Sequence, residues 1–149
     1  MGKIKKFFVY FLILICILLL LKKFIFISEE DRIKQTIKIA EKSIENNNYT
    51  EFMKQFSFEY RDEYGNTWGT LFFLVKNILK NYQKVGISIR NLNIEIFDET
   101  AVVKIFGEGK AISPSGEIIK EAGRFLIKFK KEGKKWKIVW VEEDKYRFD

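Results

Sequence analysis

The chain has 149 residues and contains 27 Lys and Arg, 20 Asp and Glu, a single cysteine and no histidine. Without histidine, catalytic triads, imidazole acid–base catalysis and the commonest transition-metal ligand are excluded, and one cysteine forms no internal disulfide. Five basic residues lie within positions 1–23, which leaves 22 against 20 acidic residues in the rest of the chain. This near-neutral balance argues against a nucleic-acid partner, and we also expect no cofactor and no metal site.

The first strong feature is an apolar run over residues 7–21, which has no charge, glycine or proline and follows three lysines. As a helix, this run rises about 22 Å, short of the roughly 30 Å hydrocarbon core of a bilayer. Continuing to Ile27 closes the gap if the stems of Lys22 and Lys23 carry their ammonium groups to the headgroups. We therefore predict that residues 1–27 form a short cytoplasmic tail and a transmembrane helix, with residues 7–27 in contact with the lipid bilayer.

Two other interpretations of the apolar run are a cleaved secretory signal and a lipoprotein signal. Cleavage needs small residues at alternate positions after the run, but Phe26 lies two residues before Ser28, the only small residue nearby. Lipidation needs a cysteine at the end of the run, whereas Cys16 lies inside it. An uncleaved anchor is therefore favoured. The excess of lysines before the run predicts a cytoplasmic N-terminus and an extracytoplasmic domain at the cell membrane.

Three helices are predicted after the anchor. The first begins at Ser28, a hydroxyl cap followed by acids, and ends at Asn46–Asn48. Its apolar residues recur at helical spacing and predict one buried stripe: Ile33, Ile37, Ala40 and Ile44. A short second helix with a Thr50 cap is expected to carry Phe52, Met53 and Phe56. Thr67 caps the third helix, which runs to about Tyr82 and is apolar enough to be covered on most sides.

Beyond Lys84 the apolar period changes from near 3.6 to 2, which predicts four antiparallel strands. The first strand alternates in one phase at Ile87 and Ile89 and in the opposite phase from Leu92, so we expect a bulge near Arg90. The other three runs cover residues 100–111, 117–131 and 135–142.

Three turns fix the expected register of this meander: two-residue loops at 98–99 and 132–133, and a loop centred on Ser115. Each register puts apolar residues on one face of the sheet, which a one-residue slip would spoil. The expected facing pairs are Ile96–Ala101, Ile94–Val103, Leu92–Ile105, Ile105–Phe125, Val103–Ile127, Phe129–Trp136, Ile127–Ile138 and Phe125–Trp140.

The element order and two stretches, EYRDEYGNTWG before the third helix and GKKWKIVWVE in the last strand, resemble the nuclear transport factor 2-like superfamily. The resemblance covers about residues 29–142. It implies one cone-shaped α+β domain over residues 28–149, with three helices packed on a curved four-stranded antiparallel sheet. The superfamily includes ketosteroid isomerases and dehydratases as well as non-catalytic binding and assembly modules. No catalytic residue of those enzymes can be matched to this sequence.

The expected register leaves two gaps in the apolar face of the sheet. Gly107 falls opposite Gly123, and Glu142 falls across from Gly123. Glu121, opposite Gly109, is a diagonal neighbour of Glu142 at about 7–8 Å, so the two carboxylates can share one opening. Apolar walls split the pKa values of such a pair, which allows acid–base chemistry without histidine. The alternative is that both acids lie in water past the core and the glycines only allow curvature.

A second candidate site is the stretch between the second and third helices, which we expect to be irregular or briefly extended. It mixes aromatic and charged residues, as pocket rims often do. We place Tyr60, Asp62 and Trp68 on the rim of a cavity, beside Arg61 and Tyr64. The alternative interpretation is that the aromatic residues anchor the core while Arg61 pairs with Asp62.

A third candidate is a lysine cluster on the other face of the last hairpin: Lys128, Lys130, Lys131, Lys134, Lys135 and Lys137. The expected register puts Lys128 opposite Lys137 and Lys130 opposite Lys135, and like charges that face each other are unfavourable. These lysines either splay into solvent or contact an anionic partner. At an anionic lipid surface each nearby lysine adds roughly 1 kcal/mol.

The sequence therefore predicts a single-pass, membrane-anchored, non-catalytic module of the cell envelope that binds a protein partner or a small apolar ligand. The alternative is a small-molecule enzyme or carrier that uses the cone cavity, with Glu121 and Glu142 as acid and base. A hollow interior lined by Phe125, Trp140 and these acids favours the alternative, and a filled interior favours an assembly module.

Overall fold

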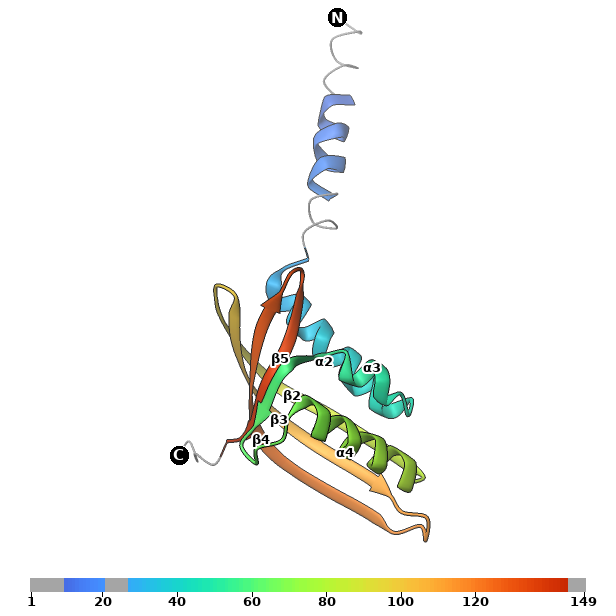
Figure 1. Ribbon diagram of the computed structural model, residues 1–149. Coiled ribbons are helices and arrows are strands. Elements are labelled where there is room, and N and C mark those ends of the chain that lie inside the picture. The colour runs from blue at the N-terminus through green and yellow to red at the C-terminus, as the bar shows by residue number, and fades with distance from the viewer. Residues whose placement is uncertain (1–9, 21–26, 145–149) are drawn as a thin grey trace, which may run out of the picture.

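Three helices lie on one face of a curved five-stranded sheet in the computed structural model, which describes residues 10–20 and 27–144 (Figure 1). A first helix spans residues 10–20. The other elements are α2 (Glu29–Glu45), α3 (Tyr49–Met53), β1 (Phe56–Asp62), α4 (Trp68–Asn81), β2 (Lys84–Phe97), β3 (Thr100–Ile112), β4 (Ile118–Glu132) and β5 (Lys135–Glu143). The strand order in the sheet is β1-β5-β4-β3-β2. The expected α+β class is confirmed.

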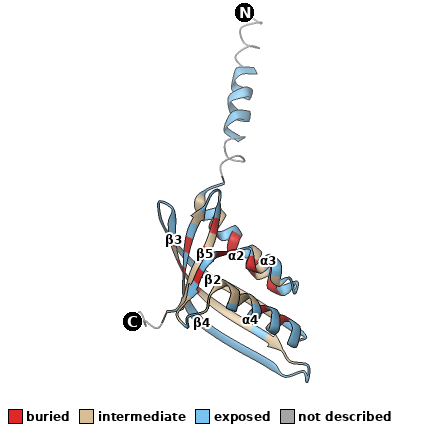
Figure 2. Cartoon of the chain, in the orientation of Figure 1, coloured by how far each residue is buried: buried red, intermediate tan, exposed pale blue. Residues whose placement is uncertain are grey.

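The expected transmembrane helix lies partly outside the described residues, which omit positions 7–9 and 21–26 of it. Within the described ranges, no helix combines the length and the apolar composition that crossing a membrane requires. Residues 10–20 are helical, and all of their side chains are exposed (Figure 2). The anchor therefore remains a prediction from the sequence.

The first predicted helix of the domain, α2, is confirmed together with its ends. The Ser28 hydroxyl accepts a hydrogen bond from the backbone N–H of Asp31, and the acids of the first turn lie at the positive end of the helix dipole. The helix ends at Glu45, and Asn46 is its C-cap. All four residues of the predicted stripe are buried: Ile33, Ile37, Ala40 and Ile44.

The short helix α3 starts earlier than the sequence predicts. Its N-cap is Asn48, whose side chain accepts a hydrogen bond from the backbone N–H of Glu51, so the expected Thr50 cap is wrong. Asn48 competes successfully because asparagine is at least as good an N-cap as threonine. Phe56, expected on this helix, opens strand β1 instead.

The third predicted helix, α4, has the expected Thr67 cap. Reciprocal hydrogen bonds between Thr67 and Thr70 form a capping box at its N-terminus. The expectation that neighbours cover it on most sides is wrong. Phe73 is 64% exposed and Leu74 is 48% exposed, while Val75 and Leu79 are buried. Only one stripe of α4 packs on the rest of the domain, so part of its apolar surface faces solvent.

The sheet has five strands rather than four, because β1 adds a parallel strand at the edge of the antiparallel meander. Phe56 pairs with Ile138 and Asp62 pairs with Val141. Of the two expected forms of this stretch, irregular or briefly extended, the extended one is confirmed. Its pattern is hard to recognise because Tyr60 is buried whereas Phe58, two residues earlier, is 81% exposed.

The register of β2, β3 and β4 is the predicted one. Asp98-Glu99 is the loop between β2 and β3, and the chain turns at residues 113–117 between β3 and β4. The bulge expected near Arg90 lies between Arg90 and Asn93, with Asn91 at a positive φ of 54°. Leu92 lies inside this irregularity and is not paired with Ile105 as expected. The other pairs are confirmed: Ile96–Ala101, Ile94–Val103, Ile105–Phe125 and Val103–Ile127.

The predicted register of β4 and β5 is wrong for two reasons. The turn is Gly133-Lys134, with Gly133 at a φ of 62°, so pairing begins at Glu132–Lys135 rather than one residue earlier on β4. A second irregularity follows, because Phe129 faces Ile138 while the preceding Lys128 faces Trp140, which leaves Val139 as the extra residue. The observed pairs that replace the expected ones are Lys131–Trp136, Phe129–Ile138, Lys130–Lys137, Lys128–Trp140, Ile127–Val141 and Phe125–Glu143.

The main core lies between α2 and the facing side of the sheet, where the buried residues concentrate (Figure 2). Ile33 and Val103 have no exposed surface, and Trp136 is 1% exposed. The indole N–H of Trp136 donates to the Glu29 carboxylate at 2.6 Å, and its backbone carbonyl accepts from the Thr36 hydroxyl at 3.2 Å. The buried indole thus has its hydrogen-bond partner, and both contacts hold α2 against β5.

Replacing Ile33 with Ala should lower the free energy of unfolding by about 2–5 kcal/mol, because it leaves a cavity under α2. Urea unfolding followed by tryptophan fluorescence measures the change. The exposed neighbour gives a matched control, since Lys34→Ala should change stability by less than about 0.5 kcal/mol. Equal effects at the two positions would contradict the packing of α2 on the sheet.

Candidate functional site

A cavity of about 540 Å³ lies between the helices and the sheet, so the cone is hollow. This volume is within the range of small-molecule sites, which are concave and mostly apolar. The cavity begins where the tight packing of α2 ends, because Ile37 and Ala40 line it whereas Ile33 does not. Its other apolar walls are Phe52, Phe56, Leu71, Ile87, Ile89, Ile105, Phe125, Ile127, Ile138 and Val141.

Three glycines of β3 and β4 belong to the cavity wall. Gly107 pairs with Gly123 as predicted. A Cβ at Gly107 would lie 3.3 Å from the ring of Phe125, and one at Gly123 would lie 3.4 Å from the same ring. The Phe125 ring therefore covers the space that the glycines leave. Gly109 differs, since a Cβ there would meet only the backbone oxygen of Glu121 at 3.9 Å.

Carboxylates line one part of this cavity, but Glu142 is not among them. Because of the extra residue Val139, Glu142 pairs with Leu126 and its carboxylate accepts a hydrogen bond from the indole N–H of Trp140 at 2.7 Å. Neither Glu142 nor Trp140 lines the cavity. The pairing of Glu142 with Gly123 is thus corrected, and the neighbouring Glu143 takes its place in the wall.

The three acids of the cavity wall are Glu108, Glu121 and Glu143. Glu108 forms an ion pair with Arg90 at 3.7 Å. No lysine or arginine among the described residues forms an ion pair with Glu121 or Glu143. A carboxylate Oε1 of Glu143 comes within 4.0 Å of the position of a Cβ at Gly123. The cavity therefore joins apolar walls to carboxylates that are able to receive a donor or a cation.

Tyr60 is the one residue of the expected aromatic rim that lies deep in the cavity wall, and it is only 3% exposed. Burial raises the pKa of its phenol well above the ordinary value, and the charge of Asp62 together with a hydrogen bond to Asp62 raises it further. The phenol is thus a neutral hydrogen-bond donor over the whole physiological range. Tyr64 also lines the cavity, at its exposed end.

Asp62 and Trp68 have structural contacts instead of a place in the cavity wall. The Asp62 carboxylate accepts hydrogen bonds from the backbone N–H groups of Tyr64 and Asn66, at 3.0 and 2.8 Å, and so closes the turn after β1. The indole N–H of Trp68 donates to the backbone oxygen of Met53 at 3.3 Å, and its ring stacks on Phe72.

The six lysines of the last hairpin differ in their contacts. Lys130 pairs with Glu59 at 2.7 Å, Lys131 pairs with Glu29 at 3.1 Å, and the ammonium of Lys128 lies 5.6 Å from the ring centroid of Trp140. The other three line a second pocket together with residues of α2 and α3: Lys134, Lys135 and Lys137. The contribution of α2 and α3 was not predicted, because no sequence pattern reports which helix meets a hairpin turn.

Neither a protein-family model nor a curated protein matches the sequence. Solved structures do match. A Nuclear transport factor 2 (NTF2-like) superfamily protein from Salmonella enterica shares 21% identity, with 75% of this chain and 87% of that chain covered and a TM-score of 0.63. The chain has the nuclear transport factor 2-like fold. Identity at this level shows the fold alone.

Two further matches with this fold carry enzyme names. A proposed scytalone dehydratase from Novosphingobium aromaticivorans shares 14% identity, with 77% of this chain and 82% of that chain covered and a TM-score of 0.72. A proposed dehydratase of the NTF2-like family from Streptomyces avermitilis shares 9% identity, with coverages of 74% and 91% and a TM-score of 0.66. Among these three matches, one is named only for its superfamily and two are named as dehydratases.

The raised pKa of Tyr60 predicts a specific loss of stability in alkali. The neutral phenol favours the folded chain, so this contribution is complete below pH 10.0 and is lost as the pH rises towards the pKa of the folded state. Tyr60→Phe cannot ionise and should show a smaller fall in Tm between about pH 9 and pH 11 than the unmodified chain. Tyr64→Phe, at an exposed position, is the control and should keep the full fall. The same slope in all three chains would refute the buried phenol.

Proposed function

We propose that this chain is a non-catalytic binding protein that holds a small, mostly apolar molecule in its cone, next to a membrane. The observation that carries the proposal is the cavity of about 540 Å³ with apolar walls. A filled cone would have favoured a protein-assembly module. A hollow cone favours a small ligand over a protein partner. Each Å² of apolar ligand surface that is buried there contributes about 25 cal/mol of favourable binding free energy.

The carboxylates suggest the chemistry at one end of the ligand. Glu121 and Glu143 line the same cavity, and no cation among the described residues neutralises them. Tyr60 adds its buried ring to the wall, since its hydroxyl is hydrogen-bonded to Asp62. A molecule with an apolar body and an amine or hydroxyl group would place its polar group at the acids and its body against the side chains of Ile105 and Phe125.

A binding role is favoured over catalysis by what the site contains. The chain has no histidine. The expected acid–base pair is not assembled, since Glu142 is hydrogen-bonded to Trp140 outside the cavity. The dehydratase names belong to proteins that share at most 14% identity with this chain, so they carry no activity across.

Membrane attachment is the second part of the proposal, and it is supported by the apolar segment at residues 7–27. Its described part, residues 10–20, is a helix that exposes large apolar side chains all along its length, Leu18 by 55% and Leu19 by 62%. A helix satisfies its own backbone hydrogen bonds, so lipid is a suitable environment for such a surface. The lysine distribution would put the N-terminus in the cytoplasm and the domain outside the cell membrane.

Closing the cavity should abolish binding. Gly109→Phe adds a ring at a wall position where a Cβ meets no close neighbour, so it should fill the opening without disturbing the sheet. With 2-naphthylmethylamine as an aromatic probe with a cationic end, isothermal titration of the full chain in neutral detergent should show at least about tenfold weaker binding.

The matched control is Gly86→Phe, which makes the same change on β2 at a position outside the cavity wall, with nothing within 4 Å of its Cβ. This variant should bind the probe with the affinity of the unmodified chain. Uptake of the probe by micelles releases the same heat in every sample, so it does not affect the comparison. Equal affinities of the Gly109 and Gly86 variants would exclude the cavity as the binding site.

The proposed topology predicts opposite outcomes for two reporters at the C-terminus. Alkaline phosphatase, which is active only outside the cytoplasm, should be active when fused after Asp149, and a β-galactosidase fusion at the same residue should be inactive. Deleting residues 7–21 should reverse both results. An active β-galactosidase fusion of the intact chain would overturn the orientation.

A further inference from the structure

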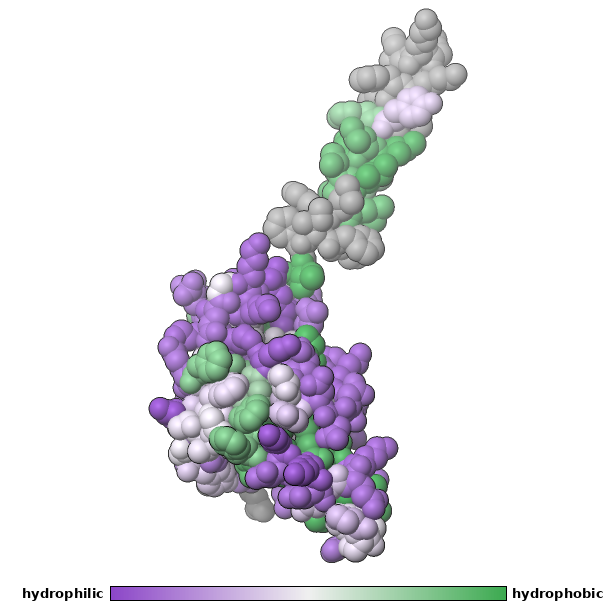
Figure 3. Space-filling view, turned by 45° about the vertical axis from the view of Figure 1, so that its right-hand side comes forward, coloured by the Kyte–Doolittle hydropathy of each residue, from purple (hydrophilic) through white to green (hydrophobic). Residues whose placement is uncertain are grey.

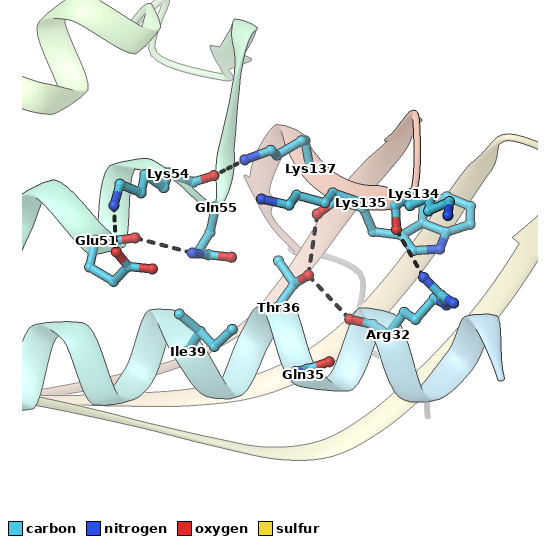
Figure 4. A pocket seen from close by; sticks show the side chains of 11 residues that line it. Arg32, Gln35, Thr36, Ile39, Glu51, Lys54, Gln55, Lys134, Lys135 and Lys137 are labelled. Atoms are coloured by element: carbon cyan, nitrogen blue, oxygen red, sulfur yellow. Dashed lines mark hydrogen bonds and ion pairs between the residues drawn. The ribbon is translucent and has the colours of Figure 1, made fainter. Parts of the chain in front are cut away.

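The second pocket, of about 360 Å³, is built from three separate elements and is strongly basic (Figure 4). α2 contributes Arg32, the end of α3 contributes Lys54, and the turn and first residues of β5 contribute three lysines. Among the described residues that line it, Glu51 is the only acid. Figure 4 shows the ends of the Lys135 and Lys137 side chains close together above α2, while the side chain of Lys54 extends away from them towards Glu51.

Most of this positive charge has no counter-charge. Lys54 pairs with Glu51 at 2.9 Å, and Arg32 lies 3.8 Å from the Glu29 carboxylate. Within residues 27–144, no carboxylate forms an ion pair with the three lysines of the turn, which are Lys134, Lys135 and Lys137.

Lys137 shows the consequence of crowding these charges. Its ammonium donates to the backbone oxygen of Lys54, and partial burial together with the charge of Lys135 lowers its pKa. An anion in the pocket would relieve this repulsion, because an opposite charge nearby favours the charged form of an amine.

The pocket lies where the domain follows the apolar segment. One arginine side chain spans the two, since Nη1 of Arg32 donates to the backbone oxygen of Lys134 at 3.1 Å and its Nε lies 3.5 Å from the backbone oxygen of Ile27. Ile27 is the last residue of the predicted membrane segment. Figure 1 shows the β4–β5 turn beside the start of α2, and hydrophilic side chains dominate this end of the domain (Figure 3).

We propose that this basic pocket binds the phosphate of an anionic lipid headgroup at the surface of the membrane that residues 7–27 enter. The inference rests on the membrane attachment proposed above. One arginine side chain joins Ile27 to Lys134, so a bilayer that surrounds the segment up to Ile27 would bring its headgroups to Lys134 and Lys135. Ammonium groups without a counter-charge attract the single negative charge of a phosphodiester, and lysine binds phosphate as a compact point charge.

The test uses the full chain in neutral detergent, with lipid binding counted by native mass spectrometry. Phosphatidylglycerol should bind at lower concentration than phosphatidylcholine, and Lys134→Gln/Lys135→Gln should weaken phosphatidylglycerol binding by at least about tenfold. Neither side chain takes part in a hydrogen bond or ion pair of the described residues, so the fold should be unaffected.

The matched control is Lys110→Gln/Lys120→Gln, which removes two exposed lysines that face each other near the turn between β3 and β4. It changes the net charge equally and should leave phosphatidylglycerol binding unaltered. Equal weakening by both double variants would mean that net charge alone attracts the lipid. No weakening by Lys134→Gln/Lys135→Gln would mean that the lipid binds elsewhere. Either result overturns the pocket.

Two further measurements separate the pocket from its alternatives. Glycerophosphoglycerol, the deacylated form of phosphatidylglycerol, carries the same phosphodiester without acyl chains. If it binds as tightly as phosphatidylglycerol, the site is one for soluble phosphate esters and the proposal fails. Flotation with pure phosphatidylcholine vesicles tests attachment alone. The chain and both double variants should float, and failure to float would refute the membrane segment, independently of the pocket.

Discussion

The packing of α2 across one face of the sheet is the contact on which the rest of this structure depends. Ile33 and Trp136 are almost fully enclosed between helix and sheet, and Glu29 and Thr36 add polar contacts that fix the helix against β5. The sheet extends beyond the part on which α2 packs tightly, so the cavity begins at Ile37. At the other end of α2 the same docking brings Arg32 against the β4–β5 turn and so forms the basic pocket.

Irregularities of the strands decide which side chains face the cavity. A strand alternates its side chains between two faces, and one extra residue exchanges the faces for everything that follows. The extra residue Val139 turns Glu142 outward to Trp140 and brings Glu143 to the wall. The positive φ of Asn91 marks the corresponding bend on β2. The chemistry of the site therefore depends on single inserted residues more than on the overall fold.

Much of the fold could be predicted because its signals are local. Ser28 and Thr67 cap helices within three residues of themselves, and Asp98-Glu99 sets its own hairpin register. The failures involve contacts between distant segments. β1 pairs with a strand some 80 residues later in the chain. The β4–β5 turn lies only one residue from the expected loop, and either turn leaves Phe129 and Trp136 on the inner face of the sheet. Sequence periodicity cannot distinguish pairings that bury the same residues.

Although the net charge of the domain is near zero, acidic and basic side chains collect in two separate pockets, which are the two proposed binding sites. No lysine or arginine of the described part of the chain forms an ion pair with Glu121 or Glu143 in the cavity, while the basic pocket carries Lys134, Lys135 and Lys137. Such patches should also differ in their response to salt. The pocket holds exposed charges, which ions at physiological strength screen beyond roughly 8 Å, whereas burial of an apolar body in the cavity is little weakened by salt and is strengthened by sulfate. Raising the ionic strength would therefore weaken contact with an anionic surface while leaving an apolar ligand in place, so the two sites can act independently in one small domain.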